Sequence, residues 1–162
     1  TRTGASMADT VEYIWGYGDN GTHVELCEFP ALICYDNGVI EAQWSHNQGL
    51  AGEFWPYFLY RYNAETDQYE ICGGADAWDK SVAKTKEQGD VFPDDIDADQ
   101  DGVVYYLLPA DWDGNYDMEP VDGAKYRTWR ESFLEGASEM DDIWFWDLKE
   151  ENIAILGAEK PN

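Results

Sequence analysis

Basic side chains are scarce in this sequence. Ten Lys and Arg residues stand against 34 Asp and Glu residues, which gives a formal net charge of −24. Such an anionic surface repels phosphate backbones, so we expect no direct nucleic-acid binding. Between Lys86 and Lys125 the chain has no Lys or Arg at all, although this segment is rich in Asp. We expect a bound cation to lower the repulsion among its carboxylates.

Long apolar runs, histidine and paired cysteine are also lacking. No apolar run approaches the roughly 18 residues that span a bilayer, and no signal-peptide pattern opens the chain, so we expect any export signal or lipid anchor to lie outside it. His23 and His46 are the only histidines, which excludes a multi-histidine zinc site. The odd number and wide spacing of Cys27, Cys34 and Cys72 predict free thiols rather than a disulfide scaffold.

Motifs of cofactor enzymes are absent too. The sequence has no phosphate-binding glycine loop, dinucleotide fingerprint or redox cysteine pair, so no organic cofactor is expected. Ser45 and His46 are neighbours but lack a nucleophile-elbow pattern. Glycoside hydrolysis needs only two carboxyl groups about 5 to 10 Å apart. With so many acidic residues, a hydrolase with an unidentified carboxylate pair stays open, and no catalytic residue is singled out.

Aromatic residues are abundant, at 15% of 162 residues, and disordered chains are poor in them. The length fits one globular domain, expected at residues 11–162 after a flexible segment at 1–10. Strand patterns without regular strand–helix alternation predict an α+β fold, in which antiparallel hairpins form a meander packed with about two helices.

Three hairpins and one further strand are expected from alternating apolar residues and turn signals. The first joins residues 11–17 and 22–29, and the second joins 32–35 and 39–44 through Asp36-Asn37-Gly38, because Asn-Gly favours the positive φ angles of a tight turn. The third joins 55–62 and 68–72, and the apolar run at 103–108 is the further strand. Late strands are expected at 143–146 and 153–156.

Two helices are expected. Residues 76–88 contain helix formers, with Asp76 as a cap and Gly89 as a stop. Residues 122–136 begin at a capping Asp122 and repeat aromatic residues at helical spacing. The second helix also carries three cations, which we expect to dock against the acidic segment: Lys125, Arg127 and Arg130.

The most specific motif is an acidic loop that runs into the strand at 103–108. Asp97, Asp99 and Asp101 alternate, Gly102 follows, and Val104 is apolar. This spacing resembles the calcium loops of EF-hand and dockerin proteins, in which alternating carboxylates bind one hard cation. The resemblance implies a calcium ion as cofactor.

The loop departs from that family pattern. Leu108 stands where a bidentate Glu is usual, Tyr105 stands where a water-bridging side chain is common, and a strand follows instead of a helix. Further ligands would have to come from elsewhere, with Asp94, Asp95, Asp111 or Asp113 the nearest carboxylates and the carbonyl of Val103 an additional oxygen. The alternative is a solvated acidic turn that binds no specific ion.

A second acidic loop holds the best candidate for ligand binding. Trp112 lies between Asp111 and Asp113 in a polar stretch. An aromatic ring can stack on the apolar face of a sugar while carboxylates accept hydrogen bonds from its hydroxyls. The tryptophans in strand or helix patterns are expected in the core instead.

The composition and three short phrases resemble the acidic, Trp- and Tyr-rich extracellular domains of surface lipoproteins from gut anaerobic bacteria. The phrases are Tyr60-Arg61-Tyr62-Asn63, Asp67-Gln68-Tyr69-Glu70 and the loop at 97–102. The resemblance implies a cell-surface location and a non-enzymatic binding or adhesion module whose partner is a glycan or a surface protein. The alternative is a cytoplasmic inhibitor or immunity-type protein that binds a basic partner, because a large single-sign field steers association.

Overall fold

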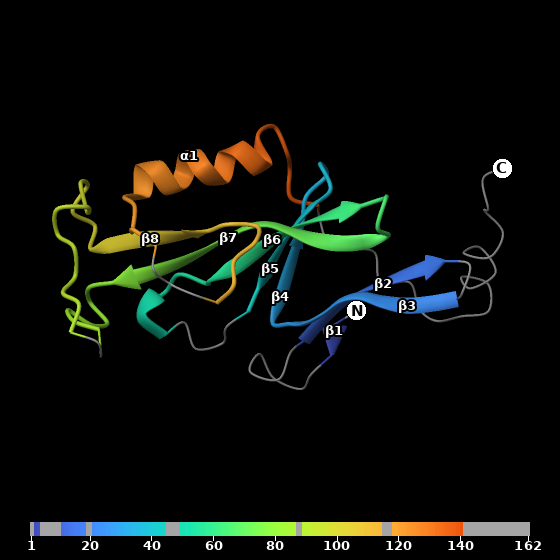
Figure 1. The fold of residues 1–162 in the computed structure, drawn as a ribbon, viewed down its shortest axis with the longest axis horizontal. Coiled ribbons are helices and arrows are strands. Elements are labelled where there is room, and N and C mark those ends of the chain that lie inside the picture. The colour runs from blue at the N-terminus through green and yellow to red at the C-terminus, as the bar shows by residue number, and fades with distance from the viewer. Residues whose placement is uncertain are drawn as a thin grey trace.

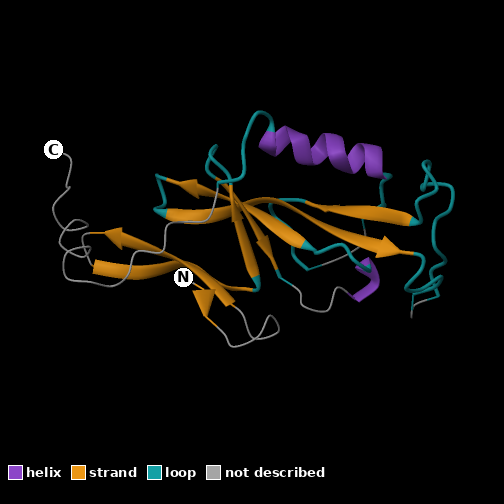
Figure 2. Ribbon diagram, turned by 180° about the vertical axis from the view of Figure 1, so that it is seen from behind, coloured by secondary structure: helices purple, strands orange, loops and turns teal. Residues whose placement is uncertain are grey.

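Two antiparallel sheets and one α-helix make up the described part of the chain (Figures 1 and 2). This computed structural model describes residues 2–3, 11–18, 21–44, 49–86, 89–114 and 118–140, and the side chains of residues 11–14 and, within these ranges, of residue 29 onward. The prediction of a mainly antiparallel, β-rich domain with few helices is confirmed.

The larger sheet is a meander in which every strand pairs with the next one along the chain. The predicted meander is confirmed for the second and third hairpins, which lie within this sheet, whereas the first hairpin belongs to a separate sheet. A short 3-10 helix, η2 (Gly49–Ala51), precedes its third strand. The strands are β4 (Ala31–Cys34), β5 (Val39–Gln43), β6 (Tyr57–Asn63), β7 (Gln68–Asp79) and β8 (Val103–Leu108).

The turn between β4 and β5 depends on Gly38. Its φ of 82° is in the left-handed region, whereas Asn37 keeps a negative φ, so a single glycine supplies the positive angle. The backbone N–H of Tyr35 donates to the carbonyl of Val39 at 2.9 Å and closes the turn. The Asn37 side chain donates to the carbonyl of Phe133 at 2.8 Å, which links the turn to the end of the helix.

The smaller sheet packs on one face of the meander. It consists of β1 (Arg2–Thr3), β2 (Val11–Gly18) and β3 (Gly21–Phe29), and β2 and β3 form the predicted first hairpin. Ile14 and Phe29 pack with Ile40 and Ala42 of β5. Because side chains alternate along a strand, Ile40 and Ala42 point away from the face that the helix covers.

Helix α1 (Gly123–Leu134) covers the opposite face of the meander (Figure 1). Trp129 and Phe133 pack against β7 at Gly73, where a Cβ atom would lie only 2.9 Å from Trp129 Cζ2 and 3.2 Å from Phe133 Cζ. The absence of a side chain at Gly73 therefore sets how closely the helix approaches the sheet. The helix predicted at residues 122–136 is confirmed.

An ion pair between a partly exposed arginine and a buried carboxylate joins α1 to β5. Arg130 Nη2 lies 2.9 Å from Glu41 Oε2 and donates to the Tyr35 hydroxyl at 2.8 Å. Glu41 is only 4% exposed, so the guanidinium compensates a carboxylate that would be costly to bury alone. The prediction that Arg130 docks against the acidic segment is therefore wrong, because its partner lies on β5.

The helix predicted at residues 76–88 is not formed. β7 continues to Asp79, and Trp78 lies opposite Val104 of β8. Trp78 is 2% exposed and packs edge-to-face on Phe92, with its indole N–H donating to the carbonyl of Ala83 at 2.8 Å. Sheet pairing and burial of this one large ring outweigh the helix propensity of the following residues.

Several expectations can be placed only in part. The late strands expected at 143–146 and 153–156 lie outside the described residues, as do His46 and the side chains of His23 and Cys27. Cys34 and Cys72 are free thiols. Within the described ranges, no helix is long and apolar enough to cross a membrane.

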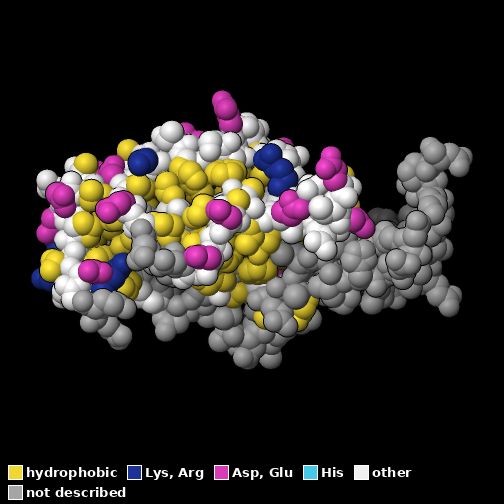
Figure 3. Space-filling view, in the orientation of Figure 1, with side chains coloured by type: hydrophobic (Ala, Val, Ile, Leu, Met, Phe, Trp, Pro, Cys, Tyr) yellow, Lys and Arg dark blue, Asp and Glu magenta, His cyan; other side chains and the backbone are white. Residues whose placement is uncertain are grey.

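On the face drawn in Figure 3, acidic side chains surround a central area of hydrophobic ones.

Candidate metal site

The acidic loop between β7 and β8 is anchored at both of its ends. Before it, Ile96 packs into the core formed by Trp78 and Phe92, and the Ile96 N–H donates to the carbonyl of Pro93 at 3.0 Å. After it, the carbonyl of Gly102 accepts a hydrogen bond of 2.9 Å from the Lys80 N–H. Asp97 thus begins the loop from a fixed and buried position.

The loop curls around the carboxylate of Asp97. Asp97 Oδ2 accepts the backbone N–H of Gly102 at 3.0 Å, across the width of the loop. Gln100 and Gly102 have positive φ angles of 57° and 83°, which turn the chain back toward β8. Asp101 Oδ1 accepts the N–H of Val103 at 2.8 Å. The Asp99 side chain, between Asp97 and Asp101 in the loop, is exposed.

Asp122 comes to the same place from the far end of the acidic segment. Val121 exchanges two backbone hydrogen bonds with Tyr105 of β8, of 2.9 and 2.7 Å, and so places Asp122 beside the loop. Asp122 Oδ2 accepts the Ala124 N–H at 3.0 Å and caps α1. Its Oδ1 accepts the N–H of Ala98 at 3.1 Å, so one carboxylate joins the helix to the loop.

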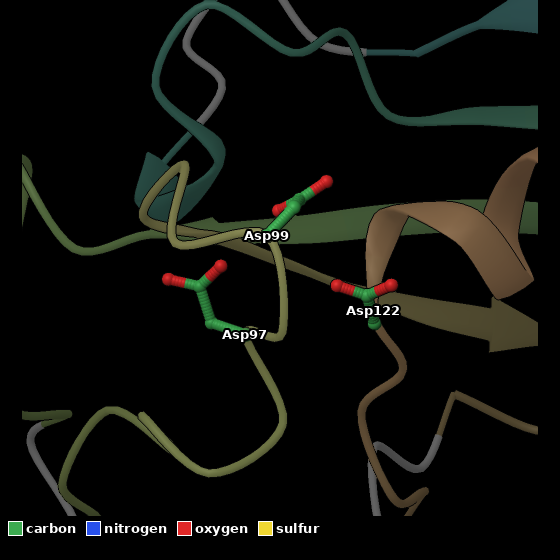
Figure 4. Close-up of side chains that lie close together, drawn as sticks. All are labelled: Asp97, Asp99 and Asp122. Carbon is green, nitrogen blue, oxygen red and sulfur yellow. The ribbon is translucent and has the colours of Figure 1, made fainter.

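Three carboxylates therefore meet at one point (Figure 4). One oxygen each from Asp97, Asp99 and Asp122 lies within 4.8 Å of the other two. Calcium binds oxygen ligands at about 2.3 to 2.6 Å, so two ligands of one ion lie at most about 5 Å apart. The spread of the three oxygens fits within this span.

The Asp97 carboxylate points to a missing partner. Asp97 is 7% exposed, and its buried Oδ1 has no hydrogen-bond partner in the structure. A buried charged oxygen without a partner is destabilising, and such oxygens are commonly paired with a cation or a donor. The same carboxylate contributes one oxygen to the three-oxygen cluster, so a cation bound there would compensate the charge of this buried group.

The hydrogen bonds of Asp122 favour the ionised form of its own carboxylate. Hydrogen bonds from backbone N–H groups, that of Ala124 foremost, hold the pKa of Asp122 below its ordinary value. One cation lies nearby, because Arg127 Nη2 is 3.9 Å from Asp99 Oδ2. Arg127 thus meets the expectation that a cation of this helix docks on the acidic segment. Burial, with the charge of Asp101 next in importance, raises the pKa of the Tyr105 hydroxyl.

The other predicted ligands are placed differently. Asp101 hydrogen-bonds within its own loop to Val103, the first residue of β8. Asp94 forms an ion pair with Lys80, and Asp95 is exposed in the preceding turn. Among the described residues, the cluster that could hold a metal ion contains Asp97 and Asp99 of the predicted set but neither Asp94, Asp95 nor Asp101.

Trp112 and its two acidic neighbours lie in the loop after β8. The Trp112 ring is half-buried and packs on Phe58 of β6 with ring centroids 5.4 Å apart, and Phe58 packs in turn on Trp44 at 4.3 Å. Asp111 and Asp113 are exposed. The structure therefore places an aromatic cluster beside carboxylates on the face opposite α1.

Asp122 was predicted only as a helix cap, and its place in the carboxylate cluster was missed. It lies 24 residues after Ala98, whose N–H it accepts, and no short motif connects the two positions. The pairing of Tyr105 with Val121 creates the contact. The only sequence signal that could have linked Asp122 to the loop is the acidic composition of the whole segment between Lys86 and Lys125.

The chain matches no protein-family model, no curated protein and no solved structure.

Proposed function

We propose that the protein binds one calcium ion through Asp97, Asp99 and Asp122, and that the ion fastens the loop before β8 to the N-terminus of α1. The observation that carries the proposal is the buried, unpartnered Oδ1 of Asp97 within a cluster of three carboxylates. All three candidate ligands are oxygens, which suit hard cations rather than zinc or copper.

The proposed ion has a structural role. Asp97 belongs to a loop anchored in the core around Trp78, and Asp122 begins the helix that covers the opposite face of the sheet. Three carboxylates alone do not fill the six to eight positions around calcium, so water and backbone carbonyls would supply the others. Such a site binds in the range of about 0.1 to 1 mM, which calcium-rich extracellular fluid can saturate.

Calcium titration of chelator-treated protein tests this proposal. Saturable binding by calorimetry should accompany a rise in Tm, because an ion that binds only the folded chain stabilises it by about 1.4 kcal/mol at ten times Kd. For a chain of this size, that corresponds to a rise of about 3 to 6 °C. Magnesium at equal concentration should give a smaller rise, because it demands near-ideal octahedral geometry and gives up water reluctantly.

The variant Asp97→Asn should lose both responses, and Asp113→Asn provides the matched control. Both substitutions remove one negative charge, but Asp113 is exposed in the loop after β8 and lies outside the cluster. An equal calcium response in wild type and Asp97→Asn would contradict the proposed site.

We also propose that this ion-stabilised domain is a non-enzymatic extracytoplasmic binding module for a glycan or a surface protein. The contact of Trp112 with Phe58 next to exposed Asp111 and Asp113 supports a ligand surface, because aromatic rings and carboxylates together suit sugar faces and hydroxyls. Binding on a glycan array should be lost in Trp112→Ala and kept in Asp97→Asn assayed below its Tm. Absence of glycan binding by the wild-type protein would contradict the glycan ligand.

A further inference from the structure

Arg127 lies directly at the carboxylate cluster, on the second turn of α1. Its Nη2 is 3.9 Å from Asp99 Oδ2. Both side chains meet over Gly123, where a Cβ atom would lie 3.1 Å from Arg127 Nη1 and 3.4 Å from Asp99 Oδ2. The buried glycine at this position therefore leaves the space in which the guanidinium reaches the cluster.

This contact is loose enough to be exchanged. The side chains of Arg127 and Asp99 are 60% and 40% exposed, and their separation is at the long end for an ion pair. Exposed pairs of this kind contribute little to stability because solvent screens them. Asp97 and Asp122, in contrast, are each held by backbone N–H donors.

We propose that Arg127 is an internal counter-ion that competes with calcium for Asp99 and thereby sets the affinity of the site. The inference rests on the cation site proposed above. A guanidinium close to Asp99 repels a divalent cation bound by the same carboxylate, so binding requires the Arg127 side chain to move out into solvent. In the metal-free protein, Arg127 offsets the repulsion among the three carboxylates.

The test compares calcium binding by wild type, Arg127→Gln and Lys125→Gln. Removal of the competing cation should tighten calcium binding by about two- to fivefold, the range expected for one exposed ion pair. Arg127→Gln should also have a lower Tm without calcium and a larger calcium-induced rise in Tm. The reason is that the coupling is reciprocal: the Arg127 guanidinium weakens calcium binding, and bound calcium weakens the contact of Arg127 with Asp99 to the same extent. A purely structural role for Arg127 would lower the Tm without increasing that rise.

Lys125→Gln is the matched control. Lys125 is exposed on the same helix and its substitution changes the net charge by the same amount, but residues two positions apart do not share a helix face. Lys125→Gln should therefore show how much the loss of one positive charge alone changes the calcium affinity. This change should be clearly smaller than the change caused by Arg127→Gln. Arg127→Lys keeps the charge and should stay near the wild-type affinity.

The outcomes separate this inference from the proposed site. Equal affinities of Arg127→Gln and Lys125→Gln, or weaker binding by Arg127→Gln, would overturn the role of Arg127 while the cation site stands. Absence of saturable binding in wild type and Arg127→Gln alike would overturn the cation site itself. Stronger binding confined to Arg127→Gln supports both.

Discussion

At the scale of single residues, Asp122 has two structural roles. One of its oxygens accepts the Ala124 N–H and caps α1, and the other accepts the Ala98 N–H from the acidic loop. Each oxygen retains further acceptor capacity, so capping and cation binding are compatible. The two roles can be separated because a cap requires only an acceptor, whereas the cation favours a negative charge.

Asp122→Asn and Asp122→Ala should therefore behave differently. Asn still offers its one carbonyl oxygen to the Ala124 N–H but has no second oxygen for the Ala98 N–H, so the metal-free Tm should fall less than in Asp122→Ala, while calcium affinity falls by about tenfold or more. Ala removes the cap as well, and should lower the metal-free Tm by about 2 to 4 °C. Thermal melting with and without calcium measures both effects.

Glu119→Gln is a control for the change in charge, since this exposed residue precedes the helix and is outside the cluster. Equal calcium affinities of Asp122→Asn and Glu119→Gln would remove Asp122 from the ligand set. A metal-free Tm that is the same for Asn and Ala at residue 122 would show that capping contributes little.

At the scale of secondary-structure elements, tyrosine hydroxyls line the contact between α1 and the sheet. The hydroxyls of Tyr57 on β6 and Tyr126 on α1 lie 3.0 Å apart. Burial raises the pKa of both, and burial together with the neighbouring Glu41 raises the pKa of Tyr35 to about 12. These groups are therefore neutral in the folded protein where an exposed tyrosine would begin to ionise.

This contact predicts a loss of stability in alkali. A folded-state pKa above the ordinary value of 10 contributes stability that is complete below pH 10 and is lost as the pH rises through the folded value, for Tyr35 between pH 10 and about 12. The free energy of unfolding in urea should fall by up to about 1.4 kcal/mol per pH unit for each such tyrosine.

The variant Tyr57→Phe assigns part of that slope to the contact. It should be less stable at pH 8 by about 1 kcal/mol, because Tyr126 loses its hydrogen-bond partner. Its free energy of unfolding should fall less steeply than that of wild type above pH 10. An unchanged slope would mean that Tyr57 ionises alike in the folded and unfolded chain.

The helices and strands also show which local sequence signals are sufficient to predict secondary structure. The hairpins and α1 were predicted because Asn37-Gly38, the Asp122 cap and helical aromatic spacing are local signals. The helix predicted at 76–88 was wrong because its helix-forming residues follow Trp78, which the sheet buries opposite Val104. A burial that depends on a partner strand from another part of the chain overrides local propensity.

At the scale of the whole molecule, the surplus of negative charge is concentrated by the fold. The net charge of −24 is a property of composition, and much of the acidic segment lies in loops beside β8. Among the described residues, Arg127, Arg130 and Lys80 each lie within 4.0 Å of a carboxylate oxygen. These basic side chains thus compensate the charge of particular carboxylates. A bound divalent ion would compensate further negative charge at the place where the three carboxylates of the cluster meet.

The sequence by itself determined the three hairpins, the strand at 103–108, the helix within 122–136 and the presence of an acidic loop with Asp97 and Asp99, because turns, caps and alternation act over a few residues. Only the tertiary structure decided that Asp122 joins these two carboxylates and that Arg127 reaches Asp99. Both contacts depend on the pairing of Tyr105 with Val121 and on the space above Gly123. Contacts between residues far apart in the chain have no local pattern, because packing of the whole domain brings them together.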